Sequence, residues 1–258
     1  MKKKLKDLIN TLKVLRAPGG CDWDRTQTHE SLIPYLLEET YEVIEAIEQN
    51  DFILLKEELG DLLLHVIFQA ELASEDNRFD IYDSISNITD KLVSRHPHVF
   101  SNKKDKSWEK GSWELAKQKE KKRDSILDGV PKALPSLTKA NRIQEKAAGV
   151  GFDWDHLDQV YDKVYEEIDE LNEAIKSKKS DQIQEELGDV LFSIVNLSRH
   201  IDINPEVALD KSIIKFIDRF HSLEDYMNKN KLDFKNQSLS DLDKLWNKIK
   251  KRKKSNSE

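Results

Sequence analysis

The chain has 258 residues, of which 35% are charged and 38% are hydrophobic, and its formal net charge is −7. This acidic balance excludes a protein built to coat nucleic acid, and no stable nucleic-acid binding is expected. No run of about 18 apolar residues occurs and the first residues lack a signal-peptide pattern, so we expect a soluble, cytoplasmic protein without a membrane partner. The one cysteine, Cys21, excludes an intrachain disulfide and a cysteine-rich metal site.

The chain begins with a predicted amphipathic helix. Apolar side chains recur at helical spacing from Leu5 to Leu15, and residues 17–20 then interrupt the pattern. The motif CDWD (residues 21–24) follows this break, and FDWD (residues 152–155) follows a second break that contains glycine. The tryptophan of each motif either fills the core beside the loop or lies next to a bound base, and spacing leaves both roles open.

An acidic segment occurs twice, at residues 37–61 and 165–189. Five acids in each copy keep their mutual spacing at a constant offset of 128 residues: Glu38, Glu39, Glu42, Glu58 and Asp61, then Glu166, Glu167, Glu170, Glu186 and Asp189. Both copies read ExxE, a short connection and ExxD, which predicts two antiparallel helices joined by a tight turn. Gly60 and Gly188 also match, and glycine within a helix predicts close approach of another backbone.

The spacing of the acids indicates a metal site. Residues three apart share a helix face, so Glu167 and Glu170 point together, as do Glu186 and Asp189. Four converging carboxylates repel one another unless a cation neutralises them, and an all-oxygen set suits Mg²⁺, with Mn²⁺ as the alternative. A solvated acidic face would explain one ExxE, but the repetition favours the metal site.

Two further features follow each acidic segment. His65 stands where the second copy has Ser193, and it is either a packed, hydrogen-bonded histidine or a metal ligand. The pattern KxxxR at residues 91–95 and 215–219 places two cations on one helix face. Such a pair balances nearby acids or, beside a metal site, binds a polyphosphate.

The sequence predicts an all-α fold. No strand-like alternation occurs, and the nucleotide-binding and hydrolase motifs GxGxxG, GxSxG and HExxH are absent. The repeat predicts an N-terminal domain at residues 1–100, a charged linker at 101–130 and a C-terminal domain at 131–258. Because 38% hydrophobic residues is low for two small helical domains, we expect dimerisation to complete the helix bundle.

In this order and in tandem, the motifs resemble those of MazG, a family of bacterial nucleoside triphosphate pyrophosphohydrolases. The segments that carry the resemblance span nearly the whole chain: CDWD, EETYEV, EELGDLL, RHPHVF, VGFDWD, KVYEEIDE, EELGDVLF and KFIDRF. The resemblance implies tandem MazG-like helical domains in a homodimer. It also implies an enzyme in which Mg²⁺ supports hydrolysis of a nucleoside triphosphate (NTP or dNTP) to the monophosphate and pyrophosphate, in the C-terminal half.

The resemblance further implies the residues of the site. The metal ligands and catalytic residues would be Glu167, Glu170, Glu186 and Asp189. The nucleotide would contact Lys163, Val164, Tyr165, Glu166, Glu167, Lys215, Arg219 and, at the base, Trp246. The mechanism itself, apart from the resemblance, calls for an unligated acid such as Glu166 or Glu185 to accept the proton of the attacking water, and the sequence leaves the choice between them open. Gln182 departs from the basic residue of some relatives, which leaves a phosphate contact there open.

Alternatives remain at this point. The residue pattern alone predicts two active sites, because Glu39, Glu42, Glu58 and Asp61 form a complete first quartet, whereas the resemblance favours one site and a structural or vestigial first quartet. A competing hypothesis is a non-enzymatic helical interaction protein that binds metal without releasing pyrophosphate. A di-iron protein is disfavoured, because the ExxH pairs of such bundles are missing from these helices.

Overall fold

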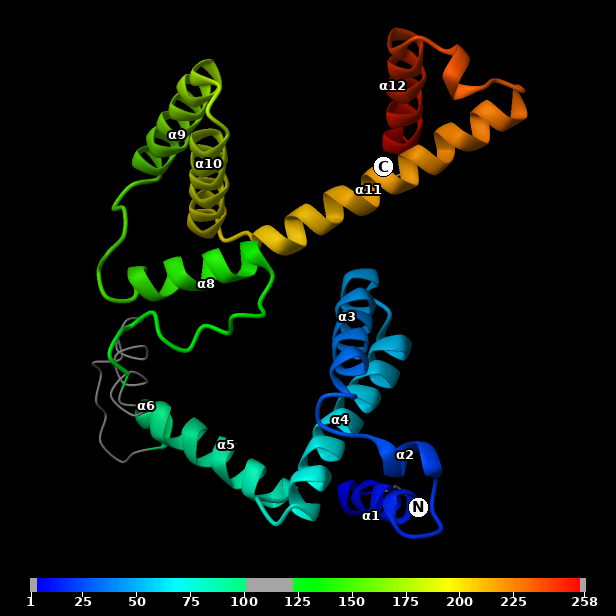
Figure 1. Cartoon of the computed structure of the whole chain (residues 1–258), viewed down its shortest axis with the longest axis vertical. Helices are drawn as coiled ribbons and strands as arrows, with labels where there is room; N and C mark the ends of the chain where they lie inside the picture. The colour runs from blue at the N-terminus through cyan, green and yellow to red at the C-terminus, as the bar shows by residue number, and fades with distance from the viewer. Residues whose placement is uncertain (1–3, 101–122, 256–258) are drawn as a thin grey trace. The chain divides into compact units, whose positions relative to one another are not determined.

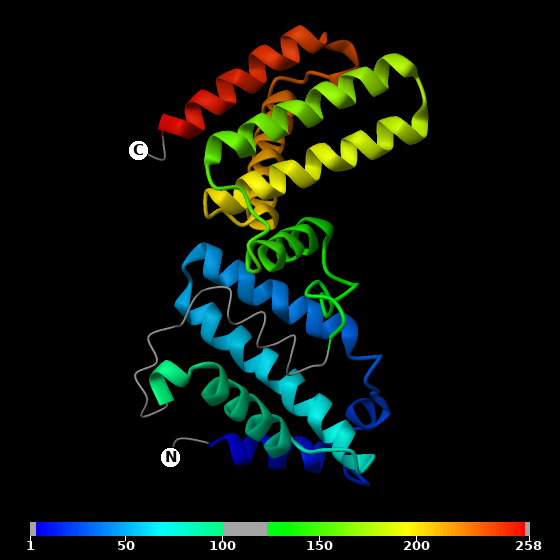
Figure 2. The same cartoon turned by 90° about the vertical axis from the view of Figure 1, so that its left-hand side faces the viewer.

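The computed structural model describes residues 4–100 and 123–255, and within these ranges all regular structure is helical (Figures 1 and 2). This confirms the all-α prediction. The chain divides into two compact units, Met1–Lys106 and Ser107–Glu258. Most of the predicted linker lies outside the described residues. None of the described helices is long and apolar enough to cross a membrane.

Unit 1 is built around an antiparallel pair of long helices, α3 and α4, which lie side by side in both views (Figures 1 and 2). Its helices are α1 (Leu5–Arg16), α2 (Asp22–Thr26), α3 (Ile33–Gln49), α4 (Phe52–Glu75), α5 (Ile81–Arg95) and α6 (Pro97–Phe100). The core lies where α1 and α5 pack against the C-terminal half of α4. Its buried side chains are Ile9, Leu12, Leu32, Ile67, Phe68, Ala70, Leu72 and Ile81.

A two-point ion pair fixes α1 to the end of α4. Arg16 donates from Nε and Nη2 to the two carboxylate oxygens of Glu75, at 2.7 and 2.6 Å. The same guanidinium lies over the ring of Phe68, 5.2 Å from its centroid. Its Nη1 also donates to the backbone carbonyl of Asp24, so one side chain joins α1, α2 and α4. Two parallel hydrogen bonds fix the relative orientation of the guanidinium and the carboxylate and also add to their attraction.

Unit 2 contains a second antiparallel pair, α9 and α10, followed by the long helix α11 and the C-terminal helix α12 (Figure 1). Its elements are α8 (Ser136–Ala148), α9 (Leu157–Ser177), α10 (Ser180–His200), α11 (Pro205–Lys229), the 3₁₀ turn η1 (Phe234–Asn236) and α12 (Leu239–Ser255). Helix α8 packs against α10 and α11, and Gln144 donates to the Phe192 carbonyl at 2.9 Å. Buried Lys146 of α8 donates to the Ile126 carbonyl at 2.8 Å, which fixes the preceding loop.

The two helix pairs repeat each other in structure as they do in sequence. Helix α3 ends at Gln49 and α9 at Ser177, and the next residues, Asn50 and Lys178, both adopt the left-handed conformation with φ of 55° and 58°. A left-handed residue ends a helix because it turns the chain out of the α conformation. The turns therefore keep the offset of 128 residues seen in the acids, and each ExxE is brought opposite an ExxD.

The FDWD loop is attached to α10 by a charged network. Asp153 accepts hydrogen bonds from both Nη atoms of Arg199, one of them at 2.9 Å, and lies 3.0 Å from Nε2 of His200. Burial opposes ionisation of Asp153, but the hydrogen bonds and charge of Arg199 outweigh burial, so the pKa of Asp153 lies below its usual value. The loop that leads into α9 is thus held against the end of α10.

Neither tryptophan of the repeated motif fills a core. Trp23 is 50% exposed and packs edge-on against Tyr35, with ring centroids 5.8 Å apart, and Trp154 is 44% exposed. Of the two roles that the sequence leaves open for these tryptophans, the structure contradicts the core role. The reason is that the polar partners of each loop, and not its aromatic ring, attach the loop to the adjacent helices.

We predict that Asp153→Asn lowers the stability of unit 2 by about 1 to 2 kcal/mol, because it removes a charge-assisted pair. A carboxyl group whose pKa is lower in the folded state than in the unfolded state stabilises the fold at pH values above its unfolded-state pKa, which is about 3.9 for aspartate. This contribution is lost as the pH falls through the folded-state pKa. The difference from wild type, measured by urea unfolding, should thus be present at pH 7 and shrink below about pH 4. Exposed Asp155→Asn is the control. Equal effects of both changes would contradict the role of Asp153.

Candidate active site

Helix α9 turns one stripe of side chains toward α10. Lys163, Glu167, Glu170 and Ala174 recur at intervals of four, three and four residues, and Glu167 and Ala174 are buried. Side chains at these intervals share a helix face. The face opposite is the ExxD stripe of α10, which begins at Glu186. Packing of the two helices therefore brings acids of both motifs together.

Three carboxylates meet at this contact. One oxygen from each of Glu167, Glu170 and Glu186 lies within 4.8 Å of the other two. Glu186 has a raised pKa, first because burial disfavours its charge and then because Glu170 and Asp189 repel it. An arrangement that makes ionisation unfavourable is stabilised by a cation. An oxygen-only set of carboxylates matches the chemistry of Mg²⁺ or Mn²⁺, so these residues fit the predicted metal.

The fourth acid of the predicted quartet is placed differently. Asp189 lies outside the group of three, although its charge contributes to the raised pKa of Glu186. It is one turn further along α10 from Glu186. The structure thus brings together three of the four predicted ligands and leaves Asp189 next to them.

Lys163 neutralises part of this negative charge. Its Nζ lies 2.8 Å from Oε1 of Glu166 and 2.7 Å from Oε1 of Glu167. The pKa of Lys163 is raised by the hydrogen bonds to Glu166 and then Glu167, so the side chain is an ammonium ion at neutral pH. Lys163 bridges one acid of the cluster, Glu167, and one acid of the adjoining stripe, Glu166.

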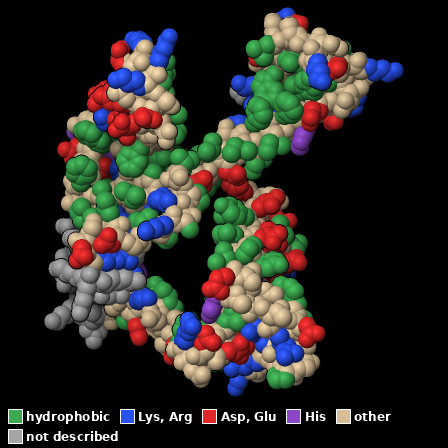
Figure 3. Space-filling model, in the orientation of Figure 1, with side chains coloured by type: hydrophobic (Ala, Val, Ile, Leu, Met, Phe, Trp, Pro, Cys, Tyr) green, Lys and Arg blue, Asp and Glu red, His purple; other side chains and the backbone are tan. Residues whose placement is uncertain are grey.

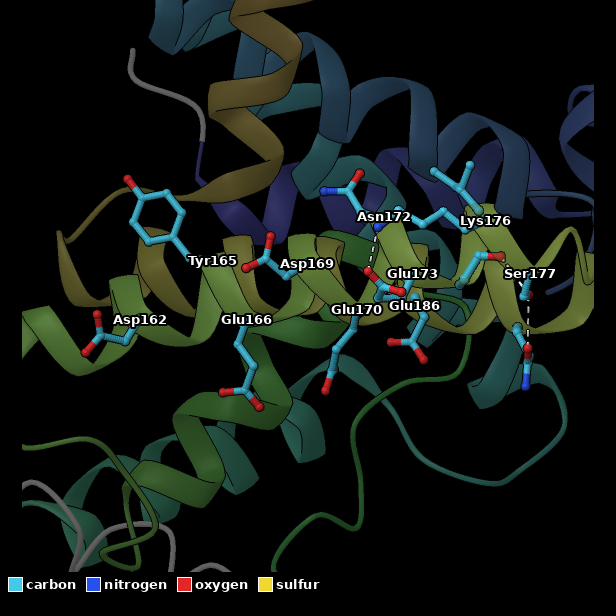
Figure 4. Close-up of a pocket in the computed structure, with 13 residues that line it drawn as sticks. Asp162, Tyr165, Glu166, Asp169, Glu170, Asn172, Glu173, Lys176, Ser177 and Glu186 are labelled. Atoms are coloured by element: carbon cyan, nitrogen blue, oxygen red, sulfur yellow. Dashed lines mark hydrogen bonds and ion pairs between the residues drawn. The ribbon is translucent and has the colours of Figure 1, made fainter.

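An open groove of about 1310 Å³ runs beside the cluster (Figure 4). A second stripe of α9, next to the first, supplies much of its wall: Asp162, Glu166, Asp169, Glu173 and Lys176, at intervals of four, three, four and three residues. Glu170 and Glu186 belong both to the groove and to the carboxylate cluster. In Figure 4, Asp162 and Tyr165 lie at one end of the groove and Lys176 and Ser177 at the other. A ligand in the groove would therefore pass directly over the predicted metal site.

The other predicted contacts divide into two groups. Tyr165 and Glu166 line the groove, whereas Val164 is buried and does not. Lys215 and Arg219 lie on α11 and Trp246 on α12, and none of the three lines the groove. Trp246 instead packs against Phe216 of α11, with ring centroids 5.1 Å apart. The described chain does not bring these three residues to the carboxylates.

Sequence reasoning missed most of the groove wall. Asp162, Asp169, Asn172, Glu173, Lys176 and Ser177 line the groove but were not among the predicted contacts. The signal was present, because the stripe that begins at Asp162 follows the same helical period as the metal-facing stripe. In a sequence with 35% charged residues, that stripe was indistinguishable from an ordinary solvated face.

The first copy forms a similar acidic cluster in unit 1. One oxygen from each of Glu39, Glu58 and Asp61 lies within 4.8 Å of the other two. The pKa of Glu39 is raised by burial and then by Asp61, and the pKa of Glu58 by burial and then by Glu42. The position of Lys163 is occupied by Tyr35. The first cluster therefore has the acids without the ammonium that accompanies them in the second.

His65 is packed, as one of its two predicted roles requires, but not hydrogen-bonded. It is 8% exposed, and its buried Nδ1 has no hydrogen-bond partner among the described residues. Burial lowers its pKa, and the charge of Asp61 acts in the opposite direction. Ser193, at the matching position, donates to the Val190 carbonyl at 2.9 Å.

The prediction for the matched glycines is wrong within each unit. A Cβ atom added at Gly60 or Gly188 would meet no atom within 4 Å. Within its own unit, each glycine lies on open helix surface with no other backbone against it.

Comparison with known proteins agrees with this architecture. The model of the MazG nucleotide pyrophosphohydrolase domain matches residues 27–100 and 157–223, and each matched segment contains one complete acidic helix pair. The chain belongs to the MazG family. It is 45% identical over 244 residues to the nucleoside triphosphate pyrophosphohydrolase/pyrophosphatase MazG of Thermotoga maritima, covering 95% of this chain and 94% of that protein. It is 44% identical over 254 residues to the nucleoside triphosphate pyrophosphohydrolase of Escherichia coli K12, covering 94% and 95%.

Membership of a MazG pyrophosphohydrolase family identifies the chain as an enzyme and disfavours the non-enzymatic interaction protein. A more distant relative, the nucleoside triphosphate pyrophosphohydrolase of Mycobacterium tuberculosis, is 37% identical over 152 residues, which cover 58% of this chain and 46% of that protein. The resemblance inferred from the repeated motifs is therefore confirmed at the level of the family.

We predict that Glu186→Gln raises the melting temperature of the metal-free protein, because it removes repulsion within the cluster. A carboxyl group whose pKa is higher in the folded state than in the unfolded state makes its full contribution to stability below its unfolded-state pKa, which is about 4.3 for glutamate. This contribution is lost as the pH rises through the folded-state pKa. The melting temperature of the variant should therefore increasingly exceed that of wild type as the pH rises from 4 to 7. Added Mg²⁺ should stabilise wild type more than the variant, because a ligand that binds the folded state stabilises it.

Differential scanning fluorimetry with and without Mg²⁺ measures both effects. Glu185→Gln is the matched control for the Mg²⁺ effect, since Glu185 precedes Glu186 in the chain but lies outside the cluster and the groove. Equal stabilisation of Glu186→Gln and wild type by Mg²⁺ would show that the metal binds elsewhere.

Proposed function

We propose that the chain hydrolyses nucleoside triphosphates to nucleoside monophosphate and pyrophosphate in the groove beside α9 and α10. The observation that carries this proposal is the convergence of Glu167, Glu170 and Glu186 at the edge of the groove. The family supports the class of reaction, because the relatives from T. maritima and E. coli are nucleoside triphosphate pyrophosphohydrolases.

The proposed metal is Mg²⁺, with Mn²⁺ as the alternative, and Glu167, Glu170, Glu186 and the adjacent Asp189 would hold it. A bound divalent ion supplies Lewis-acid polarisation of a phosphoryl oxygen and lowers the pKa of a bound water. The protein residues hold their carboxylates in position before any ligand arrives. Preorganised charges of this kind need little reorganisation during the reaction.

In the proposed reaction, the oxygen of a water molecule replaces the α–β bridging oxygen at the α-phosphorus. The water oxygen forms a bond to this phosphorus, and the bond from phosphorus to the oxygen that bridges to the β-phosphate breaks. The electron pair of the broken bond leaves with pyrophosphate. A carboxylate of the groove takes the proton released by water.

Of the two predicted proton acceptors, Glu166 is favoured over Glu185. Glu166 lines the groove, whereas Glu185 does not. One oxygen of Glu166 is bonded to Lys163 at 2.8 Å, so the second oxygen is the one available to water. Geometry comes before pKa in the choice of a general base, and of these two acids only Glu166 lies in the groove.

We also propose that the enzyme acts as a homodimer. Large apolar side chains on the outer faces of both helix pairs are exposed, among them Tyr41, Ile44, Leu187, Leu191 and Ile194. Figure 3 shows such side chains gathered over the described helices of each unit. Contiguous exposed apolar surface favours association. Lys215, Arg219 and Trp246 remain proposed nucleotide contacts that require α11 and α12, of the same or of a second copy, to reach the groove.

The test compares Glu170→Ala with Glu42→Ala, which removes the acid at the matching position of the first copy. Pyrophosphate release from a panel of NTPs and dNTPs with Mg²⁺ is measured for both variants and for wild type. Loss of a metal ligand should lower kcat/KM of Glu170→Ala by at least about a hundredfold. Glu42→Ala should keep most of the activity.

Each other outcome has a distinct meaning. Equal loss in both variants would indicate two active sites. Full activity of Glu170→Ala would refute the assignment of the metal ligands. Metal binding without pyrophosphate release by wild type would refute the proposed reaction.

A further inference from the structure

Lys176 is the only cation among the described residues that line the groove. Six acids line the same groove: Asp162, Glu166, Asp169, Glu170, Glu173 and Glu186. A nucleoside triphosphate carries several negative charges on its phosphate tail. A groove with this wall would repel that tail everywhere except at the metal site and near Lys176.

The position of Lys176 suits a phosphate tail that starts at the metal site. Lys176 belongs to the last turn of α9, and its Cα lies about 9 Å along the helix axis from that of Glu170, given the rise of an α-helix. Figure 4 shows Glu170 and Glu186 between Tyr165 at one end and Lys176 at the other. The flexible lysine side chain can cover the remaining distance. Its end of the groove also contains neutral polar groups on Ser177 and Gln182, whose Oγ and Oε1 lie 3.2 Å apart.

The ammonium of Lys176 is only weakly engaged in this structure. Its Nζ lies 2.6 Å from Oε1 of Glu173, but the two side chains are 70% and 74% exposed. Exposed ion pairs contribute little, so a phosphate can compete for the ammonium. Lys163, in contrast, bridges Glu166 and Glu167 and is less available. Of the two lysines, Lys176 is the one that can be recruited at small cost.

The first copy has the opposite charge at this position. Glu48 of α3 corresponds to Lys176 at the offset of 128 residues. Tyr41 and Ile44 likewise occupy the positions of Asp169 and Asn172. The first helix pair therefore has a similar carboxylate cluster but an acid where the second pair has its cation. The two copies therefore differ in charge at the position of Lys176, at the end of the α9–α10 groove and away from the carboxylates.

We propose that Lys176 binds the departing pyrophosphate part of the substrate, so that the phosphate tail points to the α9–α10 turn and the nucleoside to the Tyr165 end. The inference rests on the proposed function and adds the direction in which the substrate lies. The α-phosphate is then next to Glu170 and Glu186, and the β- and γ-phosphates extend toward Lys176. Charge reversal at Glu48 excludes the same binding in the first copy.

The test measures steady-state hydrolysis and product inhibition for Lys176→Gln. The variant should raise KM for the triphosphate about three- to tenfold, the effect of one partly exposed charge-assisted hydrogen bond, with kcat changed much less. Inhibition by pyrophosphate should weaken by a similar factor, whereas inhibition by the nucleoside monophosphate should stay as in wild type. A merely structural role of Lys176 would not separate the two products.

Two companion variants sharpen the result. Lys179→Gln makes the same change three residues away, outside the groove, and should leave KM and both inhibition constants unchanged. Glu173→Gln removes the acid that competes for Lys176 and should lower KM. If Lys176→Gln behaves like Lys179→Gln, or weakens inhibition by the monophosphate instead, the assignment is overturned.

Direct titration separates this inference from the proposed reaction. Binding of pyrophosphate with Mg²⁺ to the full chain is measured by calorimetry for wild type, Lys176→Gln and Lys179→Gln. Weaker binding by Lys176→Gln alone supports the assignment even if wild type fails to turn over triphosphates, and equal binding by all three overturns it. Failure of turnover in wild type would refute the proposed function by itself.

Discussion

Repulsion among carboxylates on two packed helices is the constraint on which the site depends. Apolar packing between α9 and α10 requires Glu167 to be buried, and the antiparallel hairpin brings Glu186 against it. The resulting pKa of Glu186 is raised by burial and by its neighbours. The packing of the two helices thus offsets the repulsion among carboxylates that would move apart in solution. A site of this kind is less stable when empty and gains stability from a cation, which is a common relation between stability and function.

The two copies place different side chains around the same helical scaffold. Both have the same turn with a left-handed residue and the same acidic spacing. They differ in the charges around the cluster, where Tyr35 replaces Lys163 and Glu48 replaces Lys176. In both copies, repulsion among the carboxylates favours the binding of a cation. Under the proposed function, the cations of the second copy are the additional positive partners that phosphate oxygens would bind beside the metal.

The remaining helices of unit 2 support this arrangement at a distance. Helix α8 is bonded to α10 through Gln144 and to α11 through Thr138, whose hydroxyl donates to Glu206 at 3.0 Å. The Asp153 network fixes the loop before α9 to the end of α10. The hairpin is therefore held at its open end, while its closed end, with Lys176, faces the groove. Anchoring at the open end fixes the hairpin that carries the carboxylates, while Lys176 at the closed end stays exposed.

The sequence by itself determined the helical class, the repeat and the acids that converge, because helical periodicity and a constant offset depend only on local geometry. It also identified the family, whose motifs extend along nearly the whole chain. Only the tertiary structure decided that Asp189 lies outside the close group and that Lys215, Arg219 and Trp246 do not line the groove. It also revealed the second stripe of α9. These features depend on how far each helix rotates and which neighbour it packs against, and residue spacing within one helix contains no information about that.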